Sequence, residues 1–355
     1  MKRILLLLII FFSCGKVLAL DTSAATVVMD MDSGRVLYEK NKDERRLIAS
    51  ITKIMTAVVA IERGNLNDKV VVGEEVLKMY GSNIYIEVGE ELALRDLLYG
   101  LMLRSGNDAA VVIATYIAGD EETFVKFMNE KAQEIGMNNT VFKNCHGLDD
   151  ETENYSTAYD MAKLSSYANR LMEYVVIAGT DRWSVTTNKK SYIWYNRNKL
   201  LKEYKYLTGG KTGFTPRAGK TLVTTASKDG LNLTIVSLKD PNHYDTQEEL
   251  YNYIFSKYKN VLLIDKDNLE LDNNIYDGLY VKSSFSYPLS DSELNFVKVY
   301  ADLYNNNYEN GDKVGEIYVL FNNEEIYREN IYAVKKENSR KSIFEYIRDF
   351  FNSLF

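Results

Sequence analysis

The sequence ASITKIMTA at residues 49–57 places a serine, Ser50, three residues before a lysine, Lys53. Two further motifs follow in order, SGN at residues 105–107 and KTG at residues 211–213. Together they provide a hydroxyl nucleophile, two lysines, a second hydroxyl and a side-chain amide, which suits acyl transfer through a covalent ester. Because each motif alone is common, the prediction depends on their order, their spacing and the local structure expected around them.

The first motif is predicted to begin a helix over residues 51–63. Residues three apart share a helix face, so Ser50 and Lys53 are expected to lie one turn apart. An ammonium group cannot accept a proton, so Lys53 has to be neutral to act as a base. Burial and a neighbouring cation such as Lys211 would lower its pKa in that direction. His146 precedes a glycine in a loop-like setting and is a poor candidate for the base.

The remaining pattern predicts an α+β fold built on one antiparallel sheet with flanking helices. Residues 24–39 and 220–238 each have the pattern of a β-hairpin, so strands from both ends of the segment would meet in one sheet. Helices are expected between them at 92–103, 108–117 and 156–171. We place this catalytic domain at 20–258 and a small β-rich domain without evident chemistry at 259–335.

The N-terminus has the pattern of a secretory signal, with two basic residues before an apolar run, and we expect cleavage after Ala19. The predicted leader, residues 1–19, holds three basic and no acidic residues, so its removal changes the net charge from −7 to −10. Such an acidic exported protein is a poor candidate for nucleic-acid binding. Cys14 follows the apolar run, and lipid attachment there is the alternative to cleavage.

The mature chain has few metal ligands. After cleavage it retains His146, His243 and a single cysteine, Cys145, so it can form no intrachain disulfide. A zinc site of the metallopeptidase kind is therefore not expected. The exclusion favours a nucleophilic serine over a metal-activated water.

The C-terminal residues 336–355 predict an amphipathic helix. Isoleucine, leucine and phenylalanine recur at helical spacing over 339–355, and charged residues occupy the opposite face. A segment this short and this charged cannot span a bilayer, but it can lie in the membrane interface. Docking on the protein's own core is the alternative, and we favour the membrane because the segment follows a separate domain.

The other two motifs carry side chains suited to binding substrate. Ser105 can relay a proton towards a leaving amine, and Asn107 can hold a substrate amide. Lys211 and Thr212 offer a charge and a hydroxyl for a substrate carboxylate. Gly213 leaves room for the substrate to align as an added strand.

The chain resembles the low-molecular-mass penicillin-binding proteins that act as serine-type D-alanyl-D-alanine carboxypeptidases. The resemblance covers nearly the whole mature chain and is carried by residues 49–57, 96–101, 156–160, 196–198 and 211–215. It implies a β-lactamase/transpeptidase-like domain with a helical subdomain. It also implies removal of the terminal D-alanine from peptidoglycan stem pentapeptides, acylation by penicillins, and no metal or organic cofactor.

The resemblance also implies roles for single residues. Ser50 would be the nucleophile and Lys53 its base, with Ser105 and Asn107 forming the second motif. Lys211 and Thr212 would lie on the carboxylate side. The backbone N–H groups of Ser50 and Phe214 would bind the oxyanion.

Arg197 would add positive charge near the substrate carboxylate, or else form a surface or structural ion pair. The sequence departs from the family pattern at Phe214, where many relatives carry a histidine. It also lacks an arginine near residues 242–244, where many relatives have one.

Other functions remain open from the sequence. A β-lactamase would share Ser50, Lys53 and Lys211 but commonly needs a glutamate that activates water, and residues 151–154 do not match that arrangement. A non-catalytic protein that binds the cell wall or senses β-lactams would become acylated but turn over poorly. An endopeptidase that cuts peptidoglycan cross-links is a further possibility.

Overall fold

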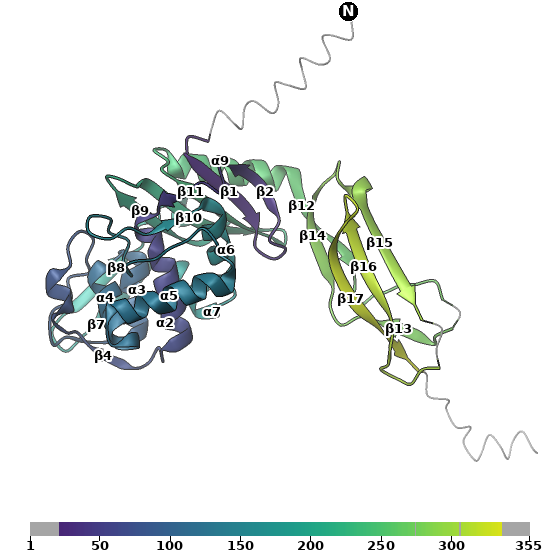
Figure 1. The fold of residues 1–355 in the computed structure, drawn as a ribbon, viewed down its shortest axis with the longest axis horizontal. Coiled ribbons are helices and arrows are strands. Elements are labelled where there is room, and N and C mark those ends of the chain that lie inside the picture. Colours follow the sequence, from purple (N-terminus) through teal and green to yellow (C-terminus); the bar gives the residue numbers. More distant parts are fainter. Residues whose placement is uncertain (1–20, 274, 305–306, 336–355) are drawn as a thin grey trace, which may run out of the picture. The chain divides into compact units, whose positions relative to one another are not determined.

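The structure is a computed structural model, and it describes residues 21–273, 275–304 and 307–335. It divides into two compact units, with the boundary between Lys257 and Tyr258. Figure 1 labels the helices and strands of both units. The predicted leader at 1–19 and the predicted amphipathic helix within 336–355 lie outside the described residues.

A five-stranded antiparallel sheet in the order β2-β1-β11-β10-β9 forms the frame of the first unit. The strands are β1 (Ala25–Asp30), β2 (Val36–Lys40), β9 (Leu207–Thr215), β10 (Gly219–Lys228) and β11 (Leu231–Leu238). Strands from both ends of the unit therefore meet in one sheet, and the KTG motif lies on its edge strand β9. The α+β prediction with an antiparallel sheet is confirmed.

Helices cover both faces of this sheet (Figure 1). The helices of the unit are α2 (Lys53–Arg63), α3 (Leu94–Leu103), α4 (Asn107–Ala118), α5 (Glu121–Ile135), α6 (Ala158–Ala168), α7 (Met172–Ala178), α8 (Leu200–Glu203) and α9 (His243–Lys257). α6 lies on one face, where Thr234 Oγ1 bonds Ser165 Oγ at 2.8 Å. α9 lies on the other, where Gln247 Nε2 donates to the carbonyl oxygen of Leu222 at 3.0 Å.

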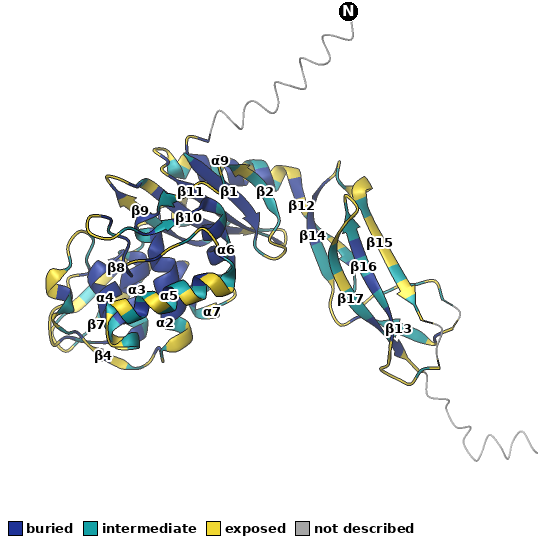
Figure 2. Cartoon of the chain, in the orientation of Figure 1, coloured by how far each residue is buried: buried dark blue, intermediate teal, exposed yellow. Residues whose placement is uncertain are grey.

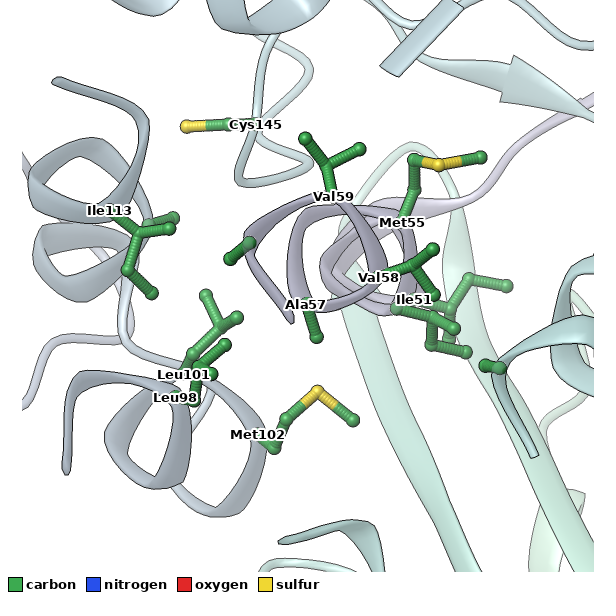
Figure 3. Close-up of a cluster of buried hydrophobic side chains, with 14 of the residues drawn as sticks. Ile51, Met55, Ala57, Val58, Val59, Leu98, Leu101, Met102, Ile113 and Cys145 are labelled. Atoms are coloured by element: carbon green, nitrogen blue, oxygen red, sulfur yellow. The ribbon is translucent and has the colours of Figure 1, made fainter. Parts of the chain in front are cut away.

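Helix α2 is buried along its first eight residues, and its apolar side chains contact the surrounding helices. Figure 3 shows it in the middle of the core, with Leu98, Leu101 and Met102 of α3 and Ile113 of α4 beside it. A helix packed on all sides is held firmly in position. The side chains at its N-terminal end therefore have a rigid support.

The local structure differs from the prediction at the first motif. Residues 51–63 do not form one helix, because Ala49–Thr52 is a 3-10 turn, η1, and α2 begins only at Lys53. Ala49 has a positive φ of 49°, and Thr221 Oγ1 donates to the carbonyl oxygen of Ile48 at 3.0 Å. The neighbouring sheet thus holds the chain in a tighter turn than helical periodicity predicts.

Several smaller elements complete the unit. Two-residue or three-residue strands pair as β3 (Arg46–Leu47) with β6 (Tyr155–Ser156) and as β4 (Lys69–Val71) with β5 (Glu91–Ala93). A hairpin of β7 (Arg182–Thr186) and β8 (Ser191–Tyr195) and a 3-10 turn η2 (Glu74–Lys78) are also present. Helix α5 and the β7–β8 hairpin were not predicted from the sequence.

The second unit consists of two small antiparallel sheets, β12-β14 and β13-β17-β16-β15. Their strands are β12 (Tyr258–Ile264), β13 (Gly278–Tyr280), β14 (Phe285–Ser290), β15 (Val297–Leu303), β16 (Lys313–Phe321) and β17 (Glu324–Val334), with a 3-10 turn η3 (Leu294–Phe296). Side chains such as Ile317, Val319 and Ile331 form its core. Figure 2 shows buried positions along β16 and more exposed ones along the edge strand β15.

None of the helices within residues 21–335 that the structure describes is long and apolar enough to cross a membrane.

Candidate active site

The turn η1 and the start of α2 bring Ser50 and Lys53 together. The Lys53 side chain is fully buried, and its Nζ lies 3.1 Å from Ser50 Oγ. Nζ also donates to Asn107 Oδ1 at 2.7 Å and to the carbonyl oxygen of His146 at 2.5 Å. Because the amide and carbonyl oxygens are acceptors only, they take two N–H groups of Lys53. A neutral amine held by these bonds has its lone pair left for the Ser50 hydroxyl.

Burial lowers the pKa of Lys53 to about 7, and the positive charge of Arg197 acts in the same direction, although Asp108 opposes them. The second buried lysine, Lys211, has its pKa lowered by burial first and then by Lys53 and Arg197. Two ammonium groups in one dry region disfavour each other's charge. The predicted lowering of the Lys53 pKa therefore agrees with the structure, with burial as its main cause and with Arg197, rather than the expected Lys211, as the cation that adds to it.

The second motif occupies the loop between α3 and α4. Ser105 has a positive φ of 65° and is almost fully buried. Asn107 Nδ2 donates to the carbonyl oxygen of Tyr80 at 2.6 Å, while its Oδ1 is taken by Lys53. The Asn107 amide is therefore held at both ends within the protein, while Nδ2 carries a second hydrogen, so the expected contact with a substrate amide stays a prediction.

Asp108 and the backbone of Asn107 hold residues 82–85 against this loop. Its carboxylate accepts backbone N–H groups from Ile84 at 3.0 Å and from Tyr85 at 2.7 Å. The backbone N–H of Asn107 in turn donates to the carbonyl oxygen of Ser82 at 2.7 Å. The loop and the segment around residue 82 are thus held as one wall of the site.

Edge strand β9 lies directly against the turn that carries the serine. A Cβ atom on Gly213 would lie 2.9 Å from the backbone nitrogen of Ser50 and 2.4 Å from Thr221 Oγ1. Only glycine leaves room for this approach. Lys211 is buried beneath the strand, where its Nζ donates to the carbonyl oxygen of Thr212 at 2.7 Å.

A cavity of about 360 Å³ opens over these elements. It is lined by Ser50, Ser82, Ser105, Arg197, Thr212, Gly213, Phe214, Lys220 and His243. Six predicted site residues are in this lining: Ser50, Ser105, Arg197, Thr212, Gly213 and Phe214. The other three, Lys53, Asn107 and Lys211, lie buried behind it and contact one another or the motif backbone.

Arg197 reaches the cavity from the loop after β8. Its Nη1 donates to Ser82 Oγ at 2.7 Å, and its backbone carbonyl accepts the Tyr244 hydroxyl at 3.1 Å. Partial burial and the nearby Arg104 lower the pKa of the guanidinium. No salt bridge to Arg197 is found in the described part of the chain, so the structure does not give it the alternative role of a structural ion pair.

Sequence reasoning missed three contributions to this site. The carbonyl of His146 holds Lys53, and a backbone contact of this kind leaves no signal in the residue types. The His146 imidazole accepts the backbone N–H of Leu148 at its Nδ1, and burial lowers its pKa to about 3. The side chains of Lys220 and His243 line the cavity although their positions in the sequence resemble an ordinary exposed strand and a helix start.

The described residues include no group of three or more histidine, cysteine, aspartate or glutamate side chains placed to hold a metal ion. The cavity and the residues buried behind it offer serine hydroxyls, lysine amines, a side-chain amide and backbone groups. These are the groups of covalent acyl transfer.

A serine on a tight turn beside a buried lysine, facing an edge strand with a KTG motif, defines a serine peptidase of the penicillin-binding type. The chain belongs to the D-alanyl-D-alanine carboxypeptidase family, whose sequence profile matches residues 17–242.

The comparisons with single proteins agree. The chain is 32% identical over 344 residues to D-alanyl-D-alanine carboxypeptidase DacF of Bacillus subtilis, covering 91% of this chain and 88% of that protein. The crystal structure of penicillin binding protein 5 from Haemophilus influenzae is similar with a TM-score of 0.73 and 27% identity, covering 89% of this chain and 97% of that one. Penicillin binding protein 6B from Escherichia coli has a TM-score of 0.69 at 27% identity, covering 87% and 95%.

Proposed function

We propose that the chain is a serine D-alanyl-D-alanine carboxypeptidase that removes the terminal D-alanine from peptidoglycan stem pentapeptides through an acyl-enzyme on Ser50. The observation that carries the mechanism is the set of three contacts at Lys53 Nζ. Two of them take its hydrogens, and the third leaves its lone pair facing the serine hydroxyl. The family match and the relatives named as D-alanyl-D-alanine carboxypeptidases support the activity.

In the first half of the reaction, Lys53 accepts the proton of Ser50 as Oγ attacks the carbonyl carbon of the penultimate D-alanine. The backbone N–H groups of Ser50 and Phe214 stabilise the oxyanion. The close approach of Gly213 to the Ser50 nitrogen supports this pairing of turn and strand. Ser105, on the wall of the same cavity, relays a proton to the leaving amine of D-alanine.

In the second half, water hydrolyses the ester and Ser50 is regenerated. Asn107 acts on Lys53 as a positioning residue that fixes the direction of the lone pair, and the second hydrogen of its Nδ2 can bind a substrate carbonyl. Thr212 and Arg197 bind the substrate carboxylate from the cavity wall, and Lys211 supports them with positive charge. Penicillins acylate the same serine because their strained amide takes the position of the substrate bond.

The test is the release of D-alanine from a purified pentapeptide muropeptide. Wild-type protein is expected to release it, and Ser50→Ala is expected to release none. No release by wild type, or equal release by the variant, would contradict the proposal. Rapid penicillin hydrolysis by the same preparation would instead indicate a β-lactamase, acylation without turnover would indicate a sensing or wall-binding protein, and cleavage of cross-linked dimers would indicate an endopeptidase.

We further propose that the protein is exported and acts at the outer face of the cytoplasmic membrane, attached through the amphipathic segment in 336–355. The signal-like leader and the phenylalanine-rich stripe of the sequence support this placement. Removal of residues 339–355 should move the protein from the membrane fraction to the soluble fraction. Continued membrane association of the truncated protein would contradict the proposed attachment.

A further inference from the structure

The wall of the cavity carries basic side chains. Arg197, Lys220 and His243 are among the nine residues that line it, and none of the nine is acidic. A pocket wall with cationic groups and no carboxylate favours an anionic ligand group. The sequence motifs account for Arg197 but not for the other two.

Lys220 reaches the cavity from strand β10. It pairs in register with Phe214 of β9, so it lies beside the strand that carries the KTG motif. Its Nζ donates to the carbonyl oxygen of Pro241 at 2.9 Å, which directs the ammonium group towards the start of α9. This backbone bond restricts the long side chain and leaves two N–H groups for another acceptor.

Lys220 differs from many exposed lysines of the catalytic unit in having no carboxylate partner. Lys69 pairs with Glu91 at 2.8 Å and Lys202 with Asp181 at 3.0 Å. No such ion pair to Lys220 is found in the described part of the chain. An unpaired ammonium on the wall of a substrate cavity is available for a carboxylate.

The positive charge of Lys220 affects the pKa of the neighbouring His243. Desolvation is the main cause that lowers its pKa to about 4, and the charges of Lys220 and Lys199 lower it further. The imidazole is therefore neutral near pH 7 and does not compete with Lys220 for an anion. Tyr244, the next residue, bonds the Arg197 carbonyl, which ties the start of α9 to the arginine on the same wall.

We propose that Lys220 binds the terminal carboxylate of the substrate together with Thr212 and Arg197, and so determines the preference for a free C-terminal acid. The proposal rests on the carboxypeptidase function proposed above. It assigns a cation to the carboxylate side at which the arginine expected near residues 242–244 is absent. Lys220 pairs in register with Phe214, the residue that follows the KTG motif on β9, and it lines the same cavity as Ser50 and Thr212.

The experiment compares two peptides that end in D-Ala-D-Ala, one as the free acid and one as the C-terminal amide. Lys220→Gln should raise KM for the acid about tenfold, with kcat changed less than about twofold. It should leave KM for the amide near its wild-type value, so that the preference for the acid falls. Lys220→Arg should retain most of the preference because it keeps the charge.

Lys228→Gln is the matched control, because it removes one lysine charge from the far end of the same strand and away from the cavity. An unchanged acid preference in Lys220→Gln, with wild type releasing D-alanine normally, would overturn this inference alone. An equal loss of the acid preference in Lys228→Gln would also overturn it, because the loss would then follow from the change in the protein's net charge and not from the position of Lys220. Absence of D-alanine release by wild type would overturn the carboxypeptidase function and this inference with it.

Discussion

The two sides of the cavity are built differently. On the nucleophile side, Lys53 is fully buried and its Nζ is bonded to Asn107 Oδ1, to the carbonyl of His146 and to Ser50. On the carboxylate side, Lys220 is exposed and unpaired, and Phe214 beside it is 64% exposed. Groups that carry out chemistry need fixed geometry and a shifted pKa, whereas groups that bind a charged substrate can remain in contact with water. We therefore expect changes on the first side to reduce reaction rates strongly and changes on the second side to affect affinity.

The largest effect is expected for Lys53→Met. Removal of the base should slow acylation of Ser50 by a labelled penicillin about a thousandfold, in the range typical of lost general-base catalysis. Lys202→Met, which changes a lysine whose side chain is 65% exposed, should acylate at the wild-type rate. Thermal unfolding of both variants shows whether the fold is kept. Acylation of a folded Lys53→Met within about tenfold of wild type would count against Lys53 as the base.

A steric change behind the nucleophile should have the next largest effect. A Cβ on Gly147 would lie 2.1 Å from the carbonyl oxygen of Ala49, so Gly147→Ala has to displace the backbone next to Ser50. We expect it to lower the free energy of unfolding by about 3 kcal/mol or more and to slow acylation.

Gly34→Ala is the matched control for this change. Gly34 has a similar positive φ of 73°, but a Cβ there would have no atom within 4 Å. It should cost only the backbone strain, about 1 kcal/mol. Equal losses of stability in the two variants, measured by chemical denaturation, would show that the contact with the Ser50 turn is not what matters.

The pH dependence of kcat/KM for D-alanine release should follow Lys53. Because its pKa is lowered to about 7, the neutral base is the main form above pH 7 and is lost as the pH falls. The rate should therefore fall about tenfold for each pH unit below 7. His146 and His243 have pKa values lowered to about 3 and about 4, so neither imidazole has its midpoint between about pH 5 and about pH 9. A rate that stays constant from about pH 5 to about pH 9 would exclude a titrating base of this kind.

The smallest expected effect is a shift in the midpoint of the pH profile, which should differ between variants of Arg197 and Lys220. Arg197 lowers the pKa of Lys53, so Arg197→Gln should move the midpoint of the pH profile upward by a fraction of a unit. Lys220→Gln should leave the midpoint in place, since Lys220 is not among the charges that shift Lys53. A midpoint that moves equally in both variants would mean that Lys220 also shifts the pKa of Lys53, which would contradict this distinction.

The sequence was sufficient to predict the sheet, its edge strand and the meeting of the three motifs, because the apolar patterns of β1, β10 and β11 are clear and the motifs fall beside them. It predicted a helix at Ser50 where the structure has a 3-10 turn. That turn depends on contacts with Thr221 and Gly213, which are distant in sequence. Local periodicity carries no information about such contacts.

The site was predictable in its residue types but not in all its contacts. Asn107 was expected to hold a substrate amide, and the structure adds a contact that the residue types do not show, between its Oδ1 and Lys53 Nζ. The carbonyl of His146 and the position of Lys220 depend on the path of the chain between elements. Only the folded arrangement shows which backbone group contacts Lys53 and which exposed lysine lines the cavity.

The central claim is that the pKa of Lys53 is low enough for a neutral amine to face Ser50 near pH 7. The most direct measurement is a ¹³C NMR titration of the Lys53 Cε in lysine-labelled protein, with the signal assigned by its absence in Lys53→Met. We predict a midpoint at about pH 7, set mainly by burial. A midpoint near the ordinary lysine value of about 10.4 would contradict the account.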